Sequence, residues 1–317
     1  MTDDRVSTLL SRKAMLDTLR HPALEFEKLT TSWAKESQID SVGLAIYPVR
    51  AVSLLEAFVR ERVRTIVNHS KVYADRARPL LQNFRSDYSF IIEIAHQTIT
   101  FGDIVAHAIP VSSLTNIITA FEQLSNRNLP QELSKAIDRW AVEIRGSPPV
   151  PIIANFDSNA AAISQIFSLR HRICHEAASL SSIEKNDMSG CLLSVSQFVN
   201  ATSWFWTELL QGNVPLTQTG MNIEAIGRAN EARSDMQAIL QELQLLLRNY
   251  PRDLRLLAAA QHAWERYESL QSYGAHDPQG GGTIGPLIRA NESFVLTQER
   301  IQRLKSHIAF SGLWALP

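Results

Sequence analysis

The sequence predicts an all-α protein with two helical domains. Apolar residues recur three and four positions apart through most of the chain, which is the spacing of one face of a helix. Turns that contain proline and glycine separate these segments. The length of 317 residues also fits two domains better than one.

The composition is that of a globular protein without a membrane segment. Hydrophobic residues make up 45% of the chain and charged residues 20%, which is ordinary for a folded protein. The formal net charge is -1, so nucleic-acid binding would require a local basic patch. The N-terminus begins with acidic residues, and no apolar run is long enough for a signal peptide or a membrane span. We therefore expect a cytoplasmic protein that does not contact a membrane.

The chain contains two cysteines, Cys174 and Cys191. Cys174 falls among apolar residues at helical spacing, so we expect it in the core. This arrangement is typical of reduced thiols rather than of a disulfide framework. A reducing compartment is therefore indicated.

The N-terminal part predicts two helices and then a long one. Residues 1 to about 40 predict an opening helix, a break at His21-Pro22 and a second short helix. Residues 49–72, after Pro48, predict one long helix whose apolar positions form a buried stripe. These positions are Val52, Leu55, Phe58, Val59, Val63 and Ile66.

Basic residues in this long helix allow two interpretations. Arg60, Arg62 and Arg64 lie between the apolar positions. They form either a solvated helix face or an electrostatic track for RNA phosphates. In the second case the RNA-binding candidates are Arg60 and Arg64, together with Arg172 further along the chain.

One acid, Glu56, interrupts the apolar stripe. A carboxylate is costly to bury unpaired, so Glu56 should reach the surface or bind a cation. We expect Arg170, in a later helix, to be its partner and Glu56 to support the site described below.

The middle of the chain predicts shorter helices. Residues 88–109 combine strand-like composition with helical surroundings, and we expect a helix there. Pro110 ends it, and helices are expected at 112–124 and 131–142. A loop with glycine and prolines at 146–151 then leads to the next helix.

Residues 168–176, Ser-Leu-Arg-His-Arg-Ile-Cys-His-Glu, place more ionisable side chains in an apolar helical pattern than any other stretch. Residues 156–159 supply helix-capping side chains upstream, and apolar residues continue to Ala178. The stretch should therefore lie well inside a helix. A polar connection at 179–189 and an apolar helix at 191–210 follow, and the two helices should pack together.

The clearest linker lies at 213–222, where Gly212, Pro215 and Gly220 stand close together. It separates a helical domain of residues 1–212 from a small helical domain of residues 223–317. Helices of the small domain are expected at 223–249, 252–273 and 286–308, with a glycine-rich loop at 274–283.

Arg170, His171 and His175 are the candidate catalytic residues. An imidazole exchanges protons near neutral pH, and a guanidinium binds phosphate as a permanent cation. These properties suit metal-independent RNA cleavage, in which His175 deprotonates the ribose 2′-hydroxyl or protonates the 5′ leaving oxygen. Arg170 would stabilise the charge that grows on the phosphate. No cofactor is expected.

Helix geometry limits how these residues act together. His171 and His175 are four residues apart and share a face, whereas Arg170 lies about 140° from His175 around an ideal helix. Arg170 must reach round, the helix must bend, or a second copy must complete the site. We therefore expect a homodimer.

The stretch around Arg170 and His175 resembles the R-x4-6-H motif of HEPN domains, and Leu54–Phe58 resembles the acidic and apolar segment of an earlier helix in that fold. The resemblance covers about residues 40 to 212, and His171 matches the polar residue that often follows the arginine. It implies a helical bundle that dimerises to bring two motifs into one cleft. Such domains are commonly ribonucleases of toxin, RNA-processing or phage-defence systems.

Two other interpretations remain open. In the first, Arg170, His175 and Glu56 form a buried polar network, and the protein is a non-catalytic helical interaction protein, antitoxin-like or regulatory. In the second, His171 and His175 bind zinc, as histidines four residues apart can do. The sequence places no third ligand near them, so no metal site is predicted.

The small domain resembles the LprI-type lysozyme-inhibitor-like domain over about residues 225 to 309. Members of that family are typically exported and carry a cysteine pair, whereas Ser272 and Glu292 stand where these cysteines are expected. This departure argues against inhibition of a periplasmic lysozyme. The stretches that carry the resemblance are 261–267, 281–287 and 296–301.

Trp264 and Tyr267 lie three residues apart and should form the core of the small domain under its glycine loop. We expect this domain to be a recognition or dimer-supporting element. The predicted partners of the whole protein are RNA, a second copy of the chain, and a cognate antitoxin or sensor protein bound through the small domain.

Overall fold

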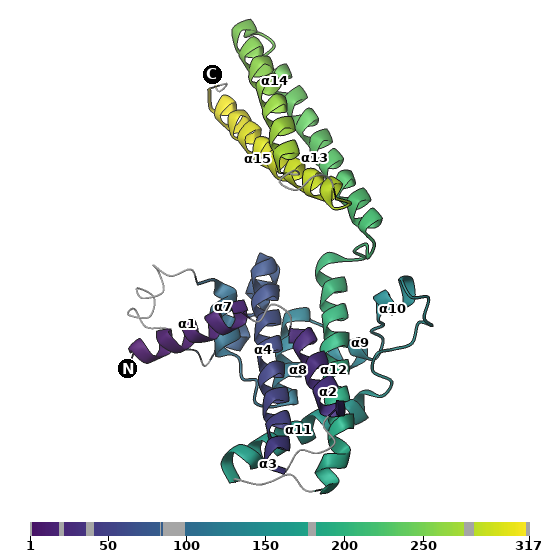
Figure 1. Ribbon diagram of the computed structural model, residues 1–317. Coiled ribbons are helices and arrows are strands. Elements are labelled where there is room, and N and C mark those ends of the chain that lie inside the picture. The colour runs from purple at the N-terminus through teal and green to yellow at the C-terminus, as the bar shows by residue number, and fades with distance from the viewer. Residues whose placement is uncertain are drawn as a thin grey trace. The chain divides into compact units, whose positions relative to one another are not determined.

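The computed structural model describes residues 2–18, 22–35, 41–82, 84, 99–176, 182–275 and 282–314. Within these ranges the chain is helical, and its one β pairing is an isolated antiparallel bridge between Ile137 and Pro151 (Figure 1). The predicted all-α class is confirmed. The chain divides into two compact units, Met1–Gly212 and Asn213–Pro317, called here the first and the second unit.

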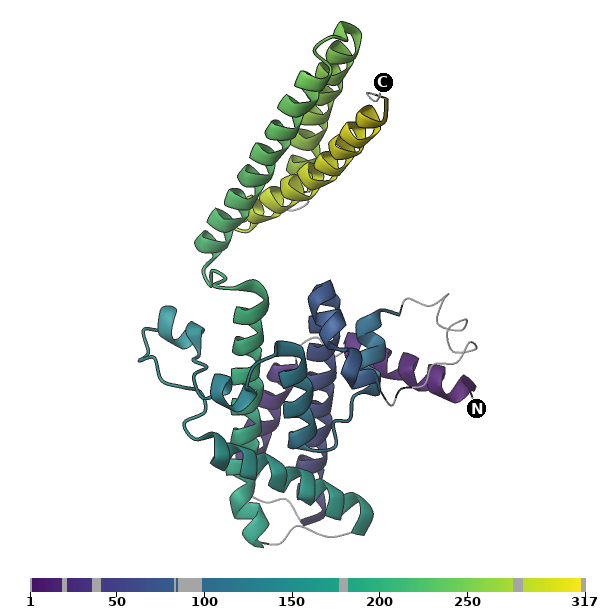
Figure 2. The ribbon, with the colours of Figure 1, turned by 180° about the vertical axis from the view of Figure 1, so that it is seen from behind.

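The first unit is a bundle of helices around the long helix α4. In chain order its elements are α1 (Thr2–Thr18), α2 (Pro22–Lys35), α3 (Ser41–Leu44), α4 (Ile46–His69), α5 (Lys71–Arg76), the 3-10 helix η1 (Arg78–Leu81), α7 (Phe101–Ala108), α8 (Leu114–Ser125), α9 (Leu129–Leu133), α10 (Arg139–Glu143), α11 (Phe156–Glu176) and α12 (Ser182–Gln211). Helix α4 contacts α2, α7, α11 and α12. Figures 1 and 2 show α4 in the centre of the bundle, where α11 crosses it.

One large apolar core holds most of this bundle together, and a separate small cluster around Val6 and Leu9 packs beneath α1. Every position predicted for the apolar stripe of α4 is buried, which confirms the stripe. Trp206 of α12 is fully buried, with its ring centroid 5.7 Å from that of Phe121 and 6.3 Å from that of Tyr73. Burial of a large apolar side chain contributes roughly 1.5 to 3 kcal/mol to stability. The core therefore fixes the helices from which the polar residues of the site project.

Side-chain caps set the start of two helices near the site. The Thr100 hydroxyl accepts a hydrogen bond from the backbone N–H of Asp103 at 3.2 Å, and the Asp103 carboxylate accepts one from the backbone N–H of Thr100 at 2.8 Å. The Ser113 hydroxyl accepts one from the backbone N–H of Asn116 at 3.3 Å. These caps satisfy N–H groups that have no partner within the helix, so α7 begins at Phe101 and α8 at Leu114. The segment 109–113 connects the two helices.

The long helix differs from its prediction at both ends. Pro48 lies in the first turn of α4 rather than before it, because backbone N–H groups of a first turn have no partner within the helix. The helix ends at His69 rather than at Val72, because Ser70 is extended with φ -158° and ψ 162°. Helix α5 follows at once as a separate element.

Of two further predictions for the middle of the chain, one lies largely outside the described residues and the other is wrong. Of the helix expected at 88–109, residues 88–98 lie outside the described residues, and α7 covers the end of the range. The single helix expected at 131–142 is wrong. Between α9 and α10 the chain pairs with Pro151 through Ile137, and Asp138 then caps α10 by accepting a hydrogen bond from the backbone N–H of Ala141 at 3.1 Å.

Helix α11 begins one residue away from its predicted cap. Asn155 accepts a hydrogen bond from the backbone N–H of Ser158 at 2.9 Å, so the cap lies just before residues 156–159. The buried Asn159 instead joins two helices, because its side-chain amide donates to the carbonyl oxygen of Ser194 on α12 at 3.0 Å. The expected packing of these two helices is confirmed.

The polar connection predicted at 179–189 is wrong for residues 182–189, which belong to α12. Met188 is fully buried in the core. This single apolar residue gives an otherwise polar turn of helix an inner face, which composition alone does not reveal.

The helices of the second unit are α13 (Gln218–Leu246), α14 (Pro251–Gly274) and α15 (Gly285–Trp314). Helix α15 packs along α13, and α14 packs against α15. Thr217 caps α13 by accepting a hydrogen bond from the backbone N–H of Gly220 at 3.0 Å. The second half of the linker predicted at 213–222 is therefore helical.

The second unit has two small apolar clusters in place of one core. Trp264 packs beside one of them, as predicted, whereas Tyr267 is 49% exposed. Residues three apart point about 60° apart around a helix, so only one of these rings faces the narrow core. The buried members of the two clusters are Met236, Leu240, Leu243, Ile301 and Leu304, and Ala225, Ala229 and Ala290.

Candidate functional site

The predicted catalytic stretch forms the last described turns of α11, and residues 177 and 178, where the helix was expected to continue, lie outside the described residues. Arg170 is half-buried, and His171 and His175 are exposed. Cys174 is also exposed, so its predicted place in the core is wrong. It lies five residues after the buried Leu169, which turns it about 140° from the inner face of the helix. The ionisable side chains are thus available to a ligand.

Arg170 lines a cavity of about 340 Å³ between α11, α4 and α1. Arg12 of α1 and Arg60 of α4 line the same cavity, and the carboxylate that faces these arginines is that of Glu56. The remaining titratable residue in the lining is His171. Three guanidinium groups against one carboxylate make this cavity a candidate anion site.

The predicted ion pair between Glu56 and Arg170 is not formed in the described part of the chain, although both side chains line this cavity. Glu56 is half-buried and acts instead on Arg60, whose charged form it favours. The pairing prediction overlooked Arg60, which lies four residues from Glu56 on the same helix and therefore shares its face.

Arg60 is held in the cavity wall by backbone acceptors of α7. Its side chain donates hydrogen bonds to the carbonyl oxygens of Ala106 and His107, the second at 3.2 Å. Burial, followed by the charge of Arg12, lowers the pKa of Arg60 to about 10, and Glu56 opposes this shift. A guanidinium with that pKa is still charged at neutral pH. Arg60 is therefore a fixed cation in the wall and not part of an exposed basic track.

His107 connects the two arginines of α1 and α4. Arg12 donates to its ring Nδ1 at 3.2 Å and to its carbonyl oxygen at 3.3 Å. Because a guanidinium only donates, Nδ1 must be the unprotonated nitrogen of a neutral ring. Burial, followed by the charges of Arg12 and Arg60, lowers the pKa of His107 to about 4. The sequence did not identify His107 or Arg12, since only the packing of α1 on α7 brings them together.

His171 and His175 face the same side of α11, as predicted. Their ring centroids are 4.8 Å apart at an interplanar angle of 43°. His171 reaches the cavity that holds Arg170, and His175 stands on the exposed last turn of the helix. Of the two histidines, the structure therefore brings His171 and not His175 beside Arg170.

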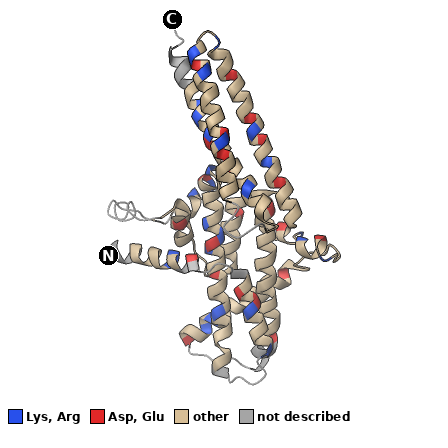
Figure 3. Ribbon diagram, turned by 45° about the horizontal axis from the view of Figure 1, so that its top comes forward, with Lys and Arg blue, Asp and Glu red and all other residues tan. Residues whose placement is uncertain are grey.

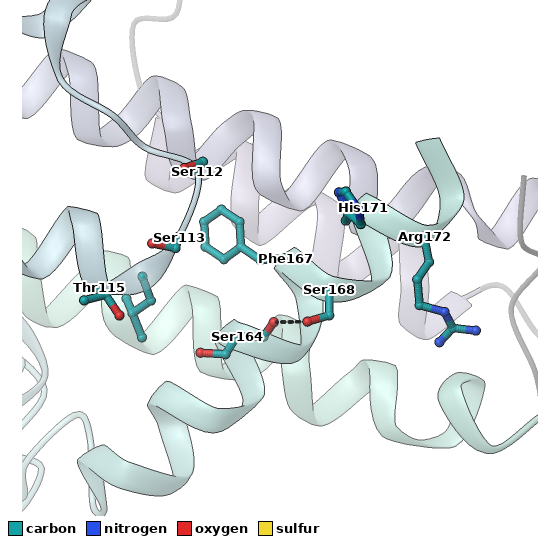
Figure 4. Close-up of a pocket in the computed structure, with 9 residues that line it drawn as sticks. Ser112, Ser113, Thr115, Ser164, Phe167, Ser168, His171 and Arg172 are labelled. Carbon is teal, nitrogen blue, oxygen red and sulfur yellow. Dashed lines mark hydrogen bonds between the residues drawn. The ribbon is translucent and has the colours of Figure 1, made fainter. Parts of the chain in front are cut away.

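A second groove of about 450 Å³ opens on the other side of Phe167. Figure 4 shows the ring of Phe167 extending from α11 toward Ser112 and Ser113, while Arg172 points away from it. Ser112, Phe167 and His171 line both spaces. The remaining lining is formed by Ser113, Leu114, Thr115, Ser164, Ser168 and Arg172.

The other basic residues of α4 are not gathered into one patch. Arg64 binds the Asp17 carboxylate at 2.6 Å and lies 3.7 Å from that of Asp103. Arg50 and Arg62 also lie near carboxylates, at 3.6 and 3.5 Å. Figure 3 shows acidic and basic residues interspersed along the helices. The basic side chains that converge are thus those of the cavity and not those of the α4 surface.

The described residues offer neither a metal cluster nor a membrane-spanning helix. No group of three or more histidine, cysteine, aspartate or glutamate side chains is placed to hold a metal ion within the residues that the structure describes. In the same part of the chain, none of the helices combines the length and apolarity needed to cross a membrane.

Comparison with known proteins concerns the second unit. Residues 213–304 match the family model described as Lysozyme inhibitor LprI, which confirms the resemblance predicted there. No curated protein and no solved structure matches the chain significantly. Ser272, at one expected cysteine position, is buried and donates to the carbonyl oxygen of Ser269 at 3.2 Å. Glu292, at the other, is half-buried.

Proposed function

We propose that the first unit is a metal-independent endoribonuclease of HEPN type that acts in the cytoplasm as a toxin or phage-defence effector. The observation that carries this proposal is the cavity where Arg170 and His171 lie together with Arg12 and Arg60, with the His175 ring 4.8 Å from that of His171. The fixed cations suit a phosphodiester, and the histidines supply groups that transfer protons near neutral pH.

The chemistry assigned to this site needs no metal ion. A histidine takes the proton of the ribose 2′-hydroxyl, and the oxygen attacks the neighbouring phosphorus. A second proton reaches the 5′ oxygen as its bond to phosphorus breaks. Arg170 stabilises the extra negative charge on the phosphate during this exchange, which leaves a 2′,3′-cyclic phosphate and a free 5′-hydroxyl. Arg12 and Arg60 hold the phosphate without taking part in proton transfer.

The proposed working form is a homodimer. Arg170 faces a cavity beside α4, whereas His175 stands exposed on the last turn of α11. An in-line displacement places the attacking and leaving oxygens on opposite sides of phosphorus, so one helix face does not readily supply both proton-transfer groups. A second copy that presents His175 across the cavity would complete the site.

The rival is a non-catalytic interaction protein in which Arg170 and His175 are structural. It depends on a buried network with Glu56, and the described residues contain no Glu56–Arg170 ion pair. An exposed His175 also contributes little to packing. Both observations favour the catalytic proposal over this rival.

The decisive experiment compares wild type with His175→Ala and Arg170→Ala on total cellular RNA. We expect each variant to lose about 100-fold or more in cleavage rate, because a proton-transfer group such as His175 and a charge-stabilising donor such as Arg170 each typically contribute that much. Cleaved ends should carry 2′,3′-cyclic phosphate. Melting temperatures should stay close to wild type, since a change at an exposed residue such as His175 shifts stability by about 0.5 kcal/mol or less.

His262→Ala is the matched control, because His262 is an exposed histidine on α14 of the second unit. It should cleave RNA like wild type. Full activity of His175→Ala would disprove the catalytic role, and an inactive wild type together with a destabilised Arg170→Ala would favour the rival.

A mixing experiment tests the dimer. Arg170→Ala and His175→Ala, each inactive alone, should regain about one quarter of wild-type activity when unfolded and refolded together, because half the dimers are mixed and each holds one intact composite site. No recovery would place both residues in one chain.

The second unit is proposed as a recognition or dimer-supporting element. Its match to the LprI family concerns this unit alone, and both cysteines of the chain lie in the first unit. We assign it the binding of a cognate antitoxin or sensor protein. Deletion of residues 213–317 should leave the RNA-cutting chemistry in place and change its control.

A further inference from the structure

We propose that the two spaces beside Phe167 hold the two halves of one nucleotide. His171 then faces the ribose between them and acts as the general base that deprotonates its 2′-hydroxyl. The phosphate occupies the cavity of Arg12, Arg60 and Arg170, and the nucleobase occupies the second groove. The proposal rests on the proposed ribonuclease function and assigns its nucleotide subsite.

The two spaces differ in charge. The cavity is lined by three arginines and one carboxylate, whereas Arg172 is the one charged residue in the lining of the second groove. Figure 4 shows the Arg172 side chain directed away from Phe167. A phosphate therefore prefers the cavity, and the groove suits an uncharged polar group.

The groove presents hydrogen-bonding groups of two kinds. On the α11 side, the Ser164 and Ser168 hydroxyls donate to the backbone one turn earlier, at 2.8 and 3.1 Å, and so offer acceptor lone pairs to the groove. On the α8 side, Ser112 and Ser113 accept hydrogen bonds from Asn116, at 3.2 and 3.3 Å, and so keep hydroxyl donors. A nucleobase edge carries both donors and acceptors and matches this arrangement.

Phe167 supplies the apolar surface that a base needs. Its ring is half-buried against the core and lies between the serines of the two walls (Figure 4). Unpaired bases are commonly held on aromatic faces of this kind. The groove volume of about 450 Å³ also accommodates a base with part of its ribose.

His171 lines both spaces and therefore marks the place where phosphate and base are joined. In a nucleotide that connection is the ribose. Neutral His171 takes the 2′-hydroxyl proton, the 2′ oxygen forms a bond to phosphorus, and the bond from phosphorus to the 5′ oxygen breaks. The proton for that 5′ oxygen comes from the imidazolium of His175 on the second copy. After the cut, His171 is protonated and His175 is neutral. Proton exchange with water then returns both histidines to their initial states.

The assignment predicts at which nucleotide the enzyme has a sequence preference. The base in the groove belongs to the ribose that attacks, so sequence preference should lie at the nucleotide that ends with the cyclic phosphate. The sequence preference at the nucleotide after the cut should be weaker. Sequencing of both ends produced from a single-stranded RNA with a randomised segment measures the two preferences separately.

Phe167→Ala, Phe167→Leu and Thr115→Val test the groove, with Thr119→Val as the matched control. Thr119 lies one turn further along α8 and does not line the groove, and Leu at position 167 keeps the packing without the flat ring. We expect Phe167→Ala and Phe167→Leu to cut at least 10-fold more slowly and to lose the preference, Thr115→Val to shift it, and Thr119→Val to behave as wild type.

His171→Ala should cut at least 100-fold more slowly, yet bind an oligonucleotide with one 2′-deoxy nucleotide at the cut site within about 3-fold of wild type by fluorescence anisotropy. Unchanged preference in both Phe167 variants, or normal cutting by His171→Ala, overturns the nucleotide assignment while the ribonuclease function stands. Absence of cutting by wild type overturns both.

Discussion

The two units of this chain bury their side chains in different ways. The first unit has one large core with fully buried Phe58, Phe121 and Trp206, beside a small cluster at Val6 and Leu9, and it also holds Arg60 at 8% exposure. The second unit has two small clusters, while Leu256 and Leu270 of α14 are exposed. A large core holds charged side chains at fixed places in cavity walls, and a narrow bundle leaves its side chains at the surface. Chemistry is thus expected in the first unit and recognition in the second.

The largest expected effect is loss of core packing in the first unit. Trp206→Ala should destabilise that unit by about 3 to 5 kcal/mol, because it removes a fully buried ring. Hydrogen exchange measured by peptide should show faster exchange throughout residues 41–82 and 99–176, with residues 218–275 unchanged. Faster exchange in both units would show that they unfold together.

Trp206→Phe and Leu304→Ala sharpen this test. The indole N–H of Trp206 is buried with no hydrogen-bond partner in the described structure, so Phe should cost much less than Ala. Leu304 is fully buried in one small cluster of the second unit. Its loss should cost about 2 to 5 kcal/mol and increase exchange in the second unit alone.

A smaller effect concerns close packing of α7 on α4. A Cβ atom at Gly102 would lie 2.5 Å from the carbonyl oxygen of Arg64 and 2.7 Å from the Asn68 side-chain amide. Gly102→Ala should therefore destabilise the first unit by about 1 to 3 kcal/mol. Urea denaturation followed by circular dichroism measures this change.

Gly227→Ala is the matched change in the second unit. Gly227 lies inside α13, and a Cβ atom there would have no neighbour within 4 Å. Alanine should stabilise this helix by about 0.5 to 1 kcal/mol, because it restricts the unfolded chain. A loss of stability there as large as that from Gly102→Ala would show that the second unit is packed as closely as the first.

The sequence predicted helical content well because that information is local. The stripe from Val52 to Ile66 repeats at helical spacing and is buried, so pattern alone was sufficient. The breaks at Ser70 and Ile137 were missed because each depends on the conformation of one residue or on pairing with a distant one. Helix ends are set by such particular contacts, which a periodic pattern does not contain.

The candidate site was predicted in part. Arg170, His171 and His175 stand out in the sequence because they lie within six residues of one another in one helix. Arg12 and His107 were missed, since they come from α1 and α7 and have no unusual sequence context. The sequence also ranked His175 above His171, and the structure places His171 in the cavity with Arg170.

An effect of another kind, a pH dependence of stability, is expected in the first unit alone. His107 has its pKa lowered from an ordinary value of 6.5 to about 4, mainly by burial and then by Arg12 and Arg60. The folded unit therefore binds this proton less readily than the unfolded chain does. Its contribution to stability is complete above about 6.5 and is lost as the pH falls through about 4. Lys13 and Asp103 also line the small space beside the ring.

His107→Asn tests this dependence, because an asparagine oxygen can accept the hydrogen bond from Arg12 and does not titrate. The melting temperature of the first unit should fall less steeply between pH 6.5 and pH 4 in the variant than in wild type. Lys13 and Asp103 are unchanged, so their titration largely cancels in that difference. The second unit should respond equally in both proteins, since His262 is exposed. Parallel curves for the first unit would mean that His107 is protonated in the fold as easily as in the unfolded chain, which the acceptor role of its Nδ1 toward Arg12 does not allow.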